Sequence, residues 1–151
     1  MKLILICLLL GLSLSYDRMA AVNYAHKYCN KYNPNYNNYR TDKPGDEAAN
    51  FISQCLSIGG GQDLSGCEGL DDKGMINGNY ALKLCLKSKG WKKNGLIAPG
   101  YIMFLFHTSY PLIVTKVNFR DIYYASHNPD RCDGKTYYFA GEMFAPPGKP
   151  F

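Results

Sequence analysis

Long hydrophobic runs are scarce in this 151-residue chain. The apolar run at residues 3–10 is too short for a membrane-spanning helix, which needs roughly 20 apolar residues, and no second long run follows. Basic clusters are short as well, the longest being Lys92-Lys93, and charged residues make up only 19% of the chain. These absences argue against a transmembrane segment and against nucleic-acid binding. The formal net charge of +5 suits an anionic surface, but ordinary solubility explains it equally well.

The first fifteen residues have the pattern of a secretory signal peptide. Lys2 supplies a positive start, Leu3–Leu10 an apolar run, and Ser13-Leu14-Ser15 a small-x-small cleavage site. Cleavage after Ser15 would leave residues 16–151, a length typical of a single domain. We therefore expect a secreted protein, either extracellular or in the endomembrane lumen.

Five cysteines follow the predicted cleavage site, and in an oxidising compartment disulfides are their default use. An odd number leaves at least one thiol unpaired. Cys55 is the candidate for this free thiol because it falls inside an apolar helical segment. The other four allow three different pairings, among which the sequence does not choose: Cys29, Cys67, Cys85 and Cys132.

Helical patterns occupy the first part of the chain and strand patterns the second. Asp17 can cap a helix that runs to Tyr32, and two further helices are expected over residues 47–58 and 78–88. Four apolar segments have strand length and are separated by short turns: 101–106, 112–119, 122–126 and 137–144. Strands joined by such short loops must be antiparallel. The sequence therefore predicts an α+β fold, with N-terminal helices packed on a C-terminal antiparallel sheet.

The stretch "GDEAANFISQC", residues 45–55, is typical of a helix that presents a nucleophile at its first turn. Unpaired N–H groups and the helix dipole lower the pKa of a thiol at such a position. A histidine on a facing strand would then take the proton, and a polar residue on the next strand would orient that histidine. Residue 48, where the reactive side chain would sit, is an alanine.

Several segments in the same order carry a resemblance to a known family: "AAVNYAHKY", "NPNY", "NFISQCLSIGG", "GLIAPGYIMFLF", "LIVTKV" and "IYYASHNPD". Over most of residues 18–131 the chain resembles the putative amidase domain family, a branch of the papain-like, NlpC-type cysteine hydrolases. The resemblance implies a papain-like fold and hydrolysis of amide bonds.

The departures from the family pattern fall at the positions of its catalytic residues. By resemblance, Ala48 stands where the family has its cysteine and Tyr110 where it has its histidine. Tyr101 replaces an aspartate, and only His127 is retained, as the third residue of the constellation. Loss of a nucleophile alone costs on the order of 10⁶ in kcat in a well-studied triad. The chain is therefore expected to be a catalytically degenerate member of the family.

The resemblance also implies a role for what remains of the cleft. The candidate binding positions are Ala48, Asn50, Tyr101, Tyr110 and His127. They would form a groove for a peptide or a peptidoglycan fragment, or they would be vestigial. No cofactor is expected, and no metal, because His26 and Cys29 have no second ligand pair at zinc-site spacing.

Two other hypotheses remain open. One is an active secreted amidase or peptidase with a relocated site, built around His107, His127 or Cys55. The other is a structural component of a secreted or surface assembly that binds protein partners through its tyrosine-rich surface, which includes Tyr24, Tyr28 and Tyr36.

Overall fold

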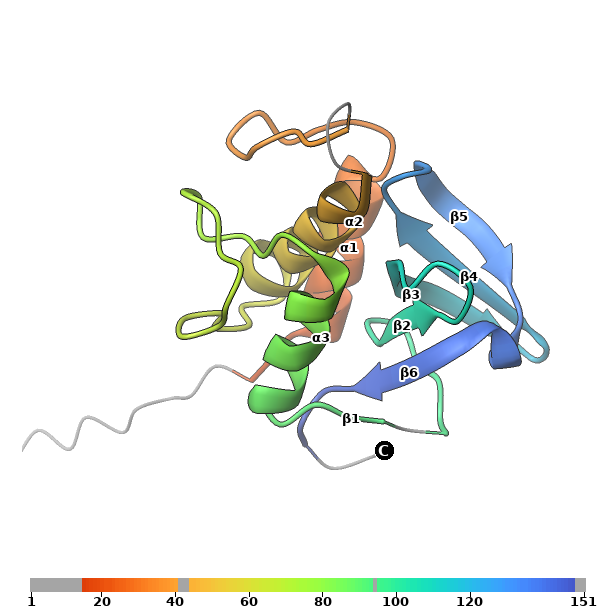
Figure 1. The fold of residues 1–151 in the computed structure, drawn as a ribbon. Helices are drawn as coiled ribbons and strands as arrows, with labels where there is room; N and C mark the ends of the chain where they lie inside the picture. The colour runs from red at the N-terminus through yellow and green to blue at the C-terminus, as the bar shows by residue number, and fades with distance from the viewer. Residues whose placement is uncertain (1–14, 41–43, 94, 149–151) are drawn as a thin grey trace, which may run out of the picture.

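The computed structural model describes residues 15–40, 44–93 and 95–148. The predicted signal peptide, apart from Ser15, lies outside the described residues. Three helices and a short π-helix come first: α1 (Arg18–Tyr28), α2 (Pro44–Gln54), η1 (Cys55–Gly59) and α3 (Asn79–Ser88). The strands are β1 (Lys92–Lys93), β2 (Ile102–Leu105), β3 (Pro111–Asn118), β4 (Asp121–Ser126), β5 (Arg131–Thr136) and β6 (Gly141–Ala145), with a 3₁₀ turn, η2 (Tyr138–Ala140), before β6. The predicted α+β class is confirmed (Figure 1).

Helix α1 begins as predicted but ends earlier. The Asp17 carboxylate accepts a hydrogen bond from the backbone N–H of Ala20 at 2.9 Å, which satisfies one of the unpaired donors of the first turn. The expected extension to Tyr32 is wrong, since the last α-helical residue is Tyr28. At this point the Tyr28 carbonyl accepts a hydrogen bond from the His127 ring, and Cys29 forms a disulfide with Cys132 of β5. Tertiary contacts therefore stop the helix.

Helix α2 does not end in an ordinary α-helical turn but continues into the π-helix η1. The backbone N–H of Gly60 bonds to the carbonyl of Cys55 at 2.9 Å, the wider spacing of a π turn. Gly59 packs directly on α1, where an added Cβ would lie 2.7 Å from the Cβ of Tyr24. A glycine is required here because no side chain fits between the two helices.

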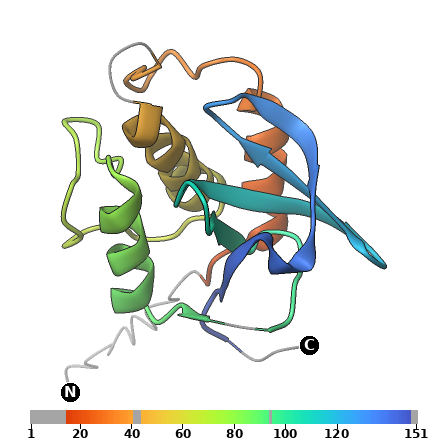
Figure 2. The ribbon, with the colours of Figure 1, turned by 45° about the vertical axis from the view of Figure 1, so that its right-hand side comes forward.

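All strand pairs of the six-stranded sheet are antiparallel, in the order β1-β6-β2-β3-β4-β5. The expectation that residues 137–144 form one strand is wrong in its first half, which contains η2. Strand β5 is at one edge of the sheet and β6 near the other, so the connecting chain must turn and cross over before it can pair with β2. Figure 2 shows this crossing segment beside the projecting β3–β4 hairpin.

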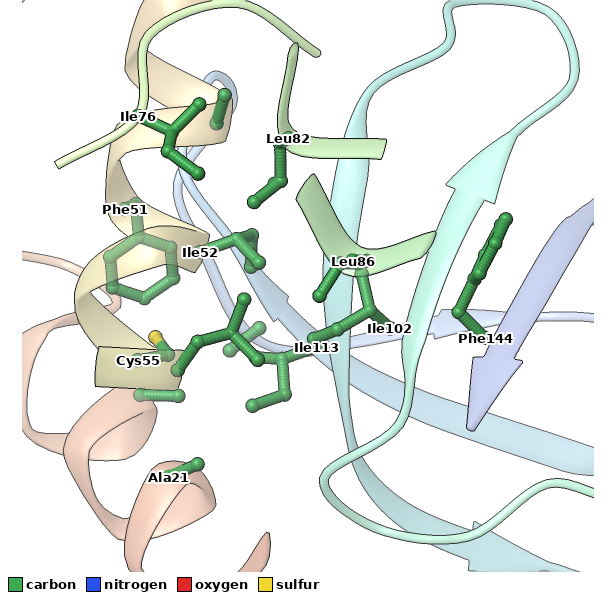
Figure 3. Packing of buried hydrophobic residues seen from close by; sticks show 14 of the residues in the cluster. Ala21, Phe51, Ile52, Cys55, Ile76, Leu82, Leu86, Ile102, Ile113 and Phe144 are labelled. Atoms are coloured by element: carbon green, nitrogen blue, oxygen red, sulfur yellow. The ribbon is translucent and has the colours of Figure 1, made fainter. Parts of the chain in front are cut away.

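The main core lies between the helices and one face of the sheet. Phe51 and Ile52 of α2 pack with Leu86 of α3 and with Ile102 and Ile113 of the sheet (Figure 3). Alternate residues of the same strands point to the opposite face, as the pleat requires. They form a second, smaller cluster that includes Met103, Leu112, Val114 and Met143.

Two disulfides reinforce this arrangement. Cys29 at the end of α1 is bonded to Cys132 of β5, and Cys67 in the long loop after η1 is bonded to Cys85 of α3. Cys55 is free and buried. Within the described ranges, the helices are all too short or too polar to cross a bilayer.

Candidate functional site

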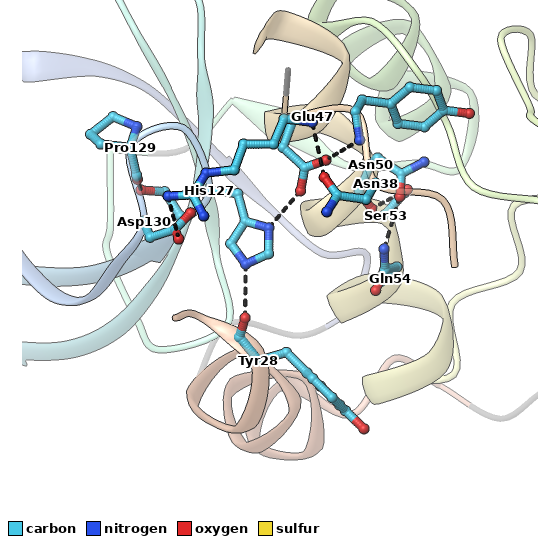
Figure 4. Close-up of polar contacts among 12 residues, drawn as sticks. Tyr28, Asn38, Glu47, Asn50, Ser53, Gln54, His127, Pro129 and Asp130 are labelled. Carbon is cyan, nitrogen blue, oxygen red and sulfur yellow. Dashed lines mark hydrogen bonds and ion pairs between the residues drawn. The ribbon is translucent and has the colours of Figure 1, made fainter. Parts of the chain in front are cut away.

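The site is built around His127, which directly follows β4 and points toward the helices (Figure 4). Its Nδ1 lies 2.6 Å from the Oε1 of Glu47, in the first turns of α2, and its Nε2 lies 2.8 Å from the carbonyl oxygen of Tyr28. Only 3% of His127 and 1% of Glu47 is exposed to solvent. One side chain thus joins the sheet to the ends of two helices.

The hydrogen bonds of His127 leave neither ring nitrogen available for chemistry. A carbonyl oxygen can only accept, so Nε2 must carry a hydrogen that it donates to Tyr28. A second proton lies between Nδ1 and the Glu47 carboxylate. The ring also stacks on Phe51, with centroids 3.8 Å apart and planes 10° from parallel. His127 is therefore held on both edges and on one face.

The segment that follows α1 covers the Glu47 end of α2. The backbone N–H of Tyr39 donates to the second carboxylate oxygen of Glu47 at 2.9 Å, and the Arg40 guanidinium pairs with Asp130 at 3.3 Å. The ring of Tyr32 also lies near His127, with centroids 4.9 Å apart and the ring planes tilted by 54°. Burial, and then the nearby carboxylates of Glu47 and Asp130, raise the pKa of Tyr32 to about 12.

Ala48 is fully buried beside this pair and brings only a methyl group to the position where the nucleophile was expected. Tyr110 is half-buried and directly precedes β3. Strands β3 and β4 are antiparallel, with Ile113 opposite Ala125. Tyr110 and His127 therefore lie at the same end of neighbouring strands. The structure brings the first turns of α2, Tyr110 and His127 to this one end of the sheet.

Asn50, the next predicted position, belongs to a buried network of amides. Its Nδ2 donates to the carboxylate of Asp71 at 3.0 Å and to Oδ1 of Asn77 at 2.8 Å, and its Oδ1 accepts from Gln54 at 2.8 Å. Partial burial works to raise the pKa of Asp71. The hydrogen bonds from the backbone of Met75 and from other donors outweigh it and hold the pKa below its usual value. Asn50 thus joins α2 to the loop before α3.

Tyr101 lies elsewhere. It precedes β2, and its carbonyl accepts from the N–H of Val114 at 2.9 Å, whereas Tyr110 lies beside Leu105 at the other end of the same strand. Its ring lies 5.6 Å from the guanidinium carbon of Arg18 and packs in the second cluster. The structure does not bring Tyr101 together with Ala48 and His127.

Two residues proposed for a relocated site, His107 and Cys55, lie in very different surroundings. His107 lies exposed in the loop between β2 and β3. Cys55 is fully buried, and burial raises the pKa of its thiol, so the reactive thiolate is disfavoured. Among the residues that the structure describes, no group of three or more histidine, cysteine or acidic side chains is placed to hold a metal ion.

The role of Glu47 did not follow from the sequence, because its partner His127 is 80 residues away along the chain. A usable signal was present, because Glu47 stands directly before Ala48, the position at which a nucleophile was expected from the sequence. Arg40 and Asp130 gave no such signal, since their pairing depends on how the loop folds back.

A comparison with known protein families matches the N-terminal part of the chain. Residues 15–69 match the family described as "Putative amidase domain". A segment of 50 residues is 50% identical to the uncharacterized protein YhbB of Bacillus subtilis (strain 168). It makes up 33% of this chain and only 14% of that relative, so the chain spans a small part of the relative's length. No solved structure gives a significant match. The amidase match covers α1, α2 and Ala48, but not the sheet.

Proposed function

We propose that this chain is a secreted, papain-like amidase-like domain that performs no hydrolysis and acts as a binding or structural module. One observation carries the proposal: Ala48, at the position where the resemblance places the nucleophile, brings only a buried methyl group. Acyl transfer by this route needs a nucleophile and a base within hydrogen-bond reach of it. Ala48 has no nucleophilic atom, and Tyr110 stands where the histidine base was expected.

The arrangement of the elements supports the papain-like part of the proposal. The first turns of α2 meet the end of an antiparallel sheet. Tyr110 precedes β3, and His127 follows the neighbouring strand β4. This is the order that a cysteine hydrolase of the resembled type would use. The two disulfides support secretion, because such bonds persist in oxidising compartments.

The burial of the site favours a structural role over an open groove. Ala48, Asn50 and His127 are each 3% exposed or less. A peptide or cell-wall fragment would reach them only if the Arg40–Asp130 pair opened and the Tyr39 N–H left Glu47. Within the proposal, the residues of the old cleft now hold the helices on the sheet, and partners bind to surfaces elsewhere.

The test is an assay of the purified protein with peptide amides and peptidoglycan fragments, with released amine as the readout. We expect no turnover. The proposal is overturned if amine is released and the release is lost in His127→Gln or Cys55→Ser but retained in Tyr80→Ser. Tyr80 is a suitable control because it is 73% exposed on α3, away from the site.

A companion variant tests the papain-like geometry separately. Ala48→Cys combined with Tyr110→His restores the two missing groups, and a thiol-reactive peptide probe then reports whether the new cysteine is activated. Labelling of the double variant well above that of Ala48→Cys alone would support the proposed frame. Equal labelling of the two variants would count against it.

A further inference from the structure

The structure has a second feature that the proposed function does not use. Five exposed apolar side chains gather around the turn between β3 and β4, and we call them the hairpin patch: Leu96, Val117, Phe119, Tyr137 and Phe139. They surround a hollow of about 500 Å³, which is also lined by Ile97 and Ile122. The hairpin projects from the body of the molecule in both ribbon views (Figures 1 and 2). It lies at the opposite end of β3 from Tyr110.

Phe119 at the tip of the hairpin does not serve the fold. Its side chain is 92% exposed, so it contributes almost nothing to the core. Its backbone has a φ of 45°, in the left-handed region that disfavours bulky side chains and favours glycine or asparagine. A residue chosen for turn stability would be one of those two. Neither the core nor the geometry of the turn accounts for an aromatic ring at this position.

The exposed cations of the hairpin lie on both of its faces. Arg120 lines the hollow together with Asp121. Lys116 and Lys135 are both paired with Tyr123 in the sheet, so they lie on the face opposite Ile122, and Lys135 forms an ion pair with Asp121 at 2.8 Å. The Arg120 guanidinium carbon lies 5.4 Å from the centre of the Phe119 ring. Surfaces that combine protruding aromatic side chains with cations are typical of proteins that bind at the interface between water and an anionic bilayer.

We propose that the hairpin patch docks this protein on the surface of an anionic lipid bilayer. The aromatic side chains enter the headgroup region and the cations contact lipid phosphates. The shape favours a bilayer over a protein partner, because Phe119 and Phe139 protrude, at 92% and 83% exposure, and would each need a matching cavity in a protein. This inference is independent of the proposed function, since it involves neither Ala48 nor His127.

Cosedimentation with lipid vesicles tests the proposal. We expect the protein to sediment with phosphatidylcholine–phosphatidylglycerol vesicles, to sediment much less with phosphatidylcholine alone, and to be released by salt. Arg120→Gln is expected to weaken binding about fivefold, the effect of one cation near an anionic surface. Phe119→Asn should weaken it at least as much, and it leaves the fold intact because asparagine accepts a positive φ.

A matched pair of tyrosines supplies the control. Tyr137 in the patch and Tyr80 on α3 are both 73% exposed. Tyr137→Ser should weaken vesicle binding, and Tyr80→Ser should leave it unchanged. A Tyr137→Trp reporter gives a second readout, because Trp91 is the only tryptophan of the chain and is 2% exposed. Its emission should shift to the blue only when anionic vesicles are added.

Several outcomes would overturn the proposal. One is the absence of binding to anionic vesicles, and another is binding by Phe119→Asn equal to that of the unaltered protein. A third is an equal loss in the two tyrosine variants. A fourth is a dimer in sedimentation velocity that Phe119→Asn dissociates, without vesicle binding, since the occupant of the patch would then be a second copy of the chain.

Discussion

Glu47 and His127 form a buried pair in which one carboxylate oxygen and one ring nitrogen lie 2.6 Å apart. The pair joins the first turns of α2 to the end of β4, and the other ring nitrogen extends the link to the end of α1. The pair therefore connects three elements of the fold, and its contribution to stability can be measured.

His127→Ala is expected to lower the free energy of unfolding by about 3–5 kcal/mol, because it leaves the Glu47 carboxylate buried without its partner. The measurement is urea unfolding followed by circular dichroism. The double variant Glu47→Leu/His127→Leu should lose less than the sum of the two single leucine variants, since it leaves no unpaired charge. Losses that simply add would show that the two side chains do not interact.

Two half-buried tyrosines, Tyr24 and Tyr32, should respond in opposite ways to removal of their hydroxyl groups. The Tyr24 hydroxyl donates to Gln54 at 2.8 Å and accepts from Asn33 at 2.9 Å, so Tyr24→Phe should cost about 1–2 kcal/mol. Among the described residues, the buried Tyr32 hydroxyl has no hydrogen-bond partner. Tyr32→Phe should therefore leave stability unchanged or raise it by up to about 1 kcal/mol. Thermal melts at neutral pH compare the two variants, and a larger loss in Tyr32→Phe would contradict the assignment.

Alkaline pH provides a separate test of Tyr32. Its pKa is raised to about 12 in the folded protein, from about 10 in an unfolded chain. Between these values the unfolded state loses the phenolic proton and the folded state keeps it, so stability falls as the pH rises from 10 toward 12. Tyr32→Phe should show a smaller fall over this range in chemical denaturation. An identical pH dependence in both proteins would show that Tyr32 ionises normally in the fold.

Acidic pH should reveal the contribution of Asp71. Its pKa is lowered in the folded state, so its stabilising effect is complete above the ordinary aspartate value of about 3.9 and is lost as the pH falls through the lower folded pKa. Asp71→Asn should be less stable at neutral pH and should depend less on pH below about 4. The test is to measure denaturation midpoints of both proteins across this pH range. The prediction is wrong if the variant loses stability in acid as steeply as the unaltered protein.

The two disulfides should contribute unequally. Cys29–Cys132 closes a loop with a sequence separation of 103, and Cys67–Cys85 one of 18. In the chain-entropy model the longer loop stabilises by about 4–5 kcal/mol and the shorter by about 3. Replacing each pair by alanines and measuring urea midpoints tests the order. Equal losses would mean that native contacts, rather than loop length, set the effect.

The part of the fold that follows from local patterns was predictable. The Asp17 cap, the three helices, and the antiparallel strands that begin at residues 102, 111 and 121 follow from apolar spacing and turn residues, although the second helix begins at Pro44 rather than at the expected residue 47. Strand β5 was missed because its sequence, "RCDGKT", has no apolar alternation. Its position is set by pairing with β4 and by the Cys29–Cys132 bond, neither of which is a local property.

The site was predictable only in part and for a similar reason. The resemblance indicated which positions to inspect, and Ala48 can be read directly from the sequence. Burial cannot be read in the same way, and it was the Tyr39 and Arg40 contacts across a loop that closed the region around Glu47. The hairpin patch was also missed, because Leu96, Phe119 and Phe139 are distant in sequence and come together only when the sheet curves.

The two edges of the sheet limit how this protein can associate. Edge strands usually offer unpaired backbone groups to which another chain can add a strand. Here β1 has only two residues, both exposed lysines, and β5 alternates exposed Arg131, Asp133 and Lys135 with partly buried neighbours. Short or charged edges of this kind discourage strand addition and fibril growth. We therefore expect any assembly of this domain to form through its side-chain surfaces and to leave the described six-stranded sheet unextended.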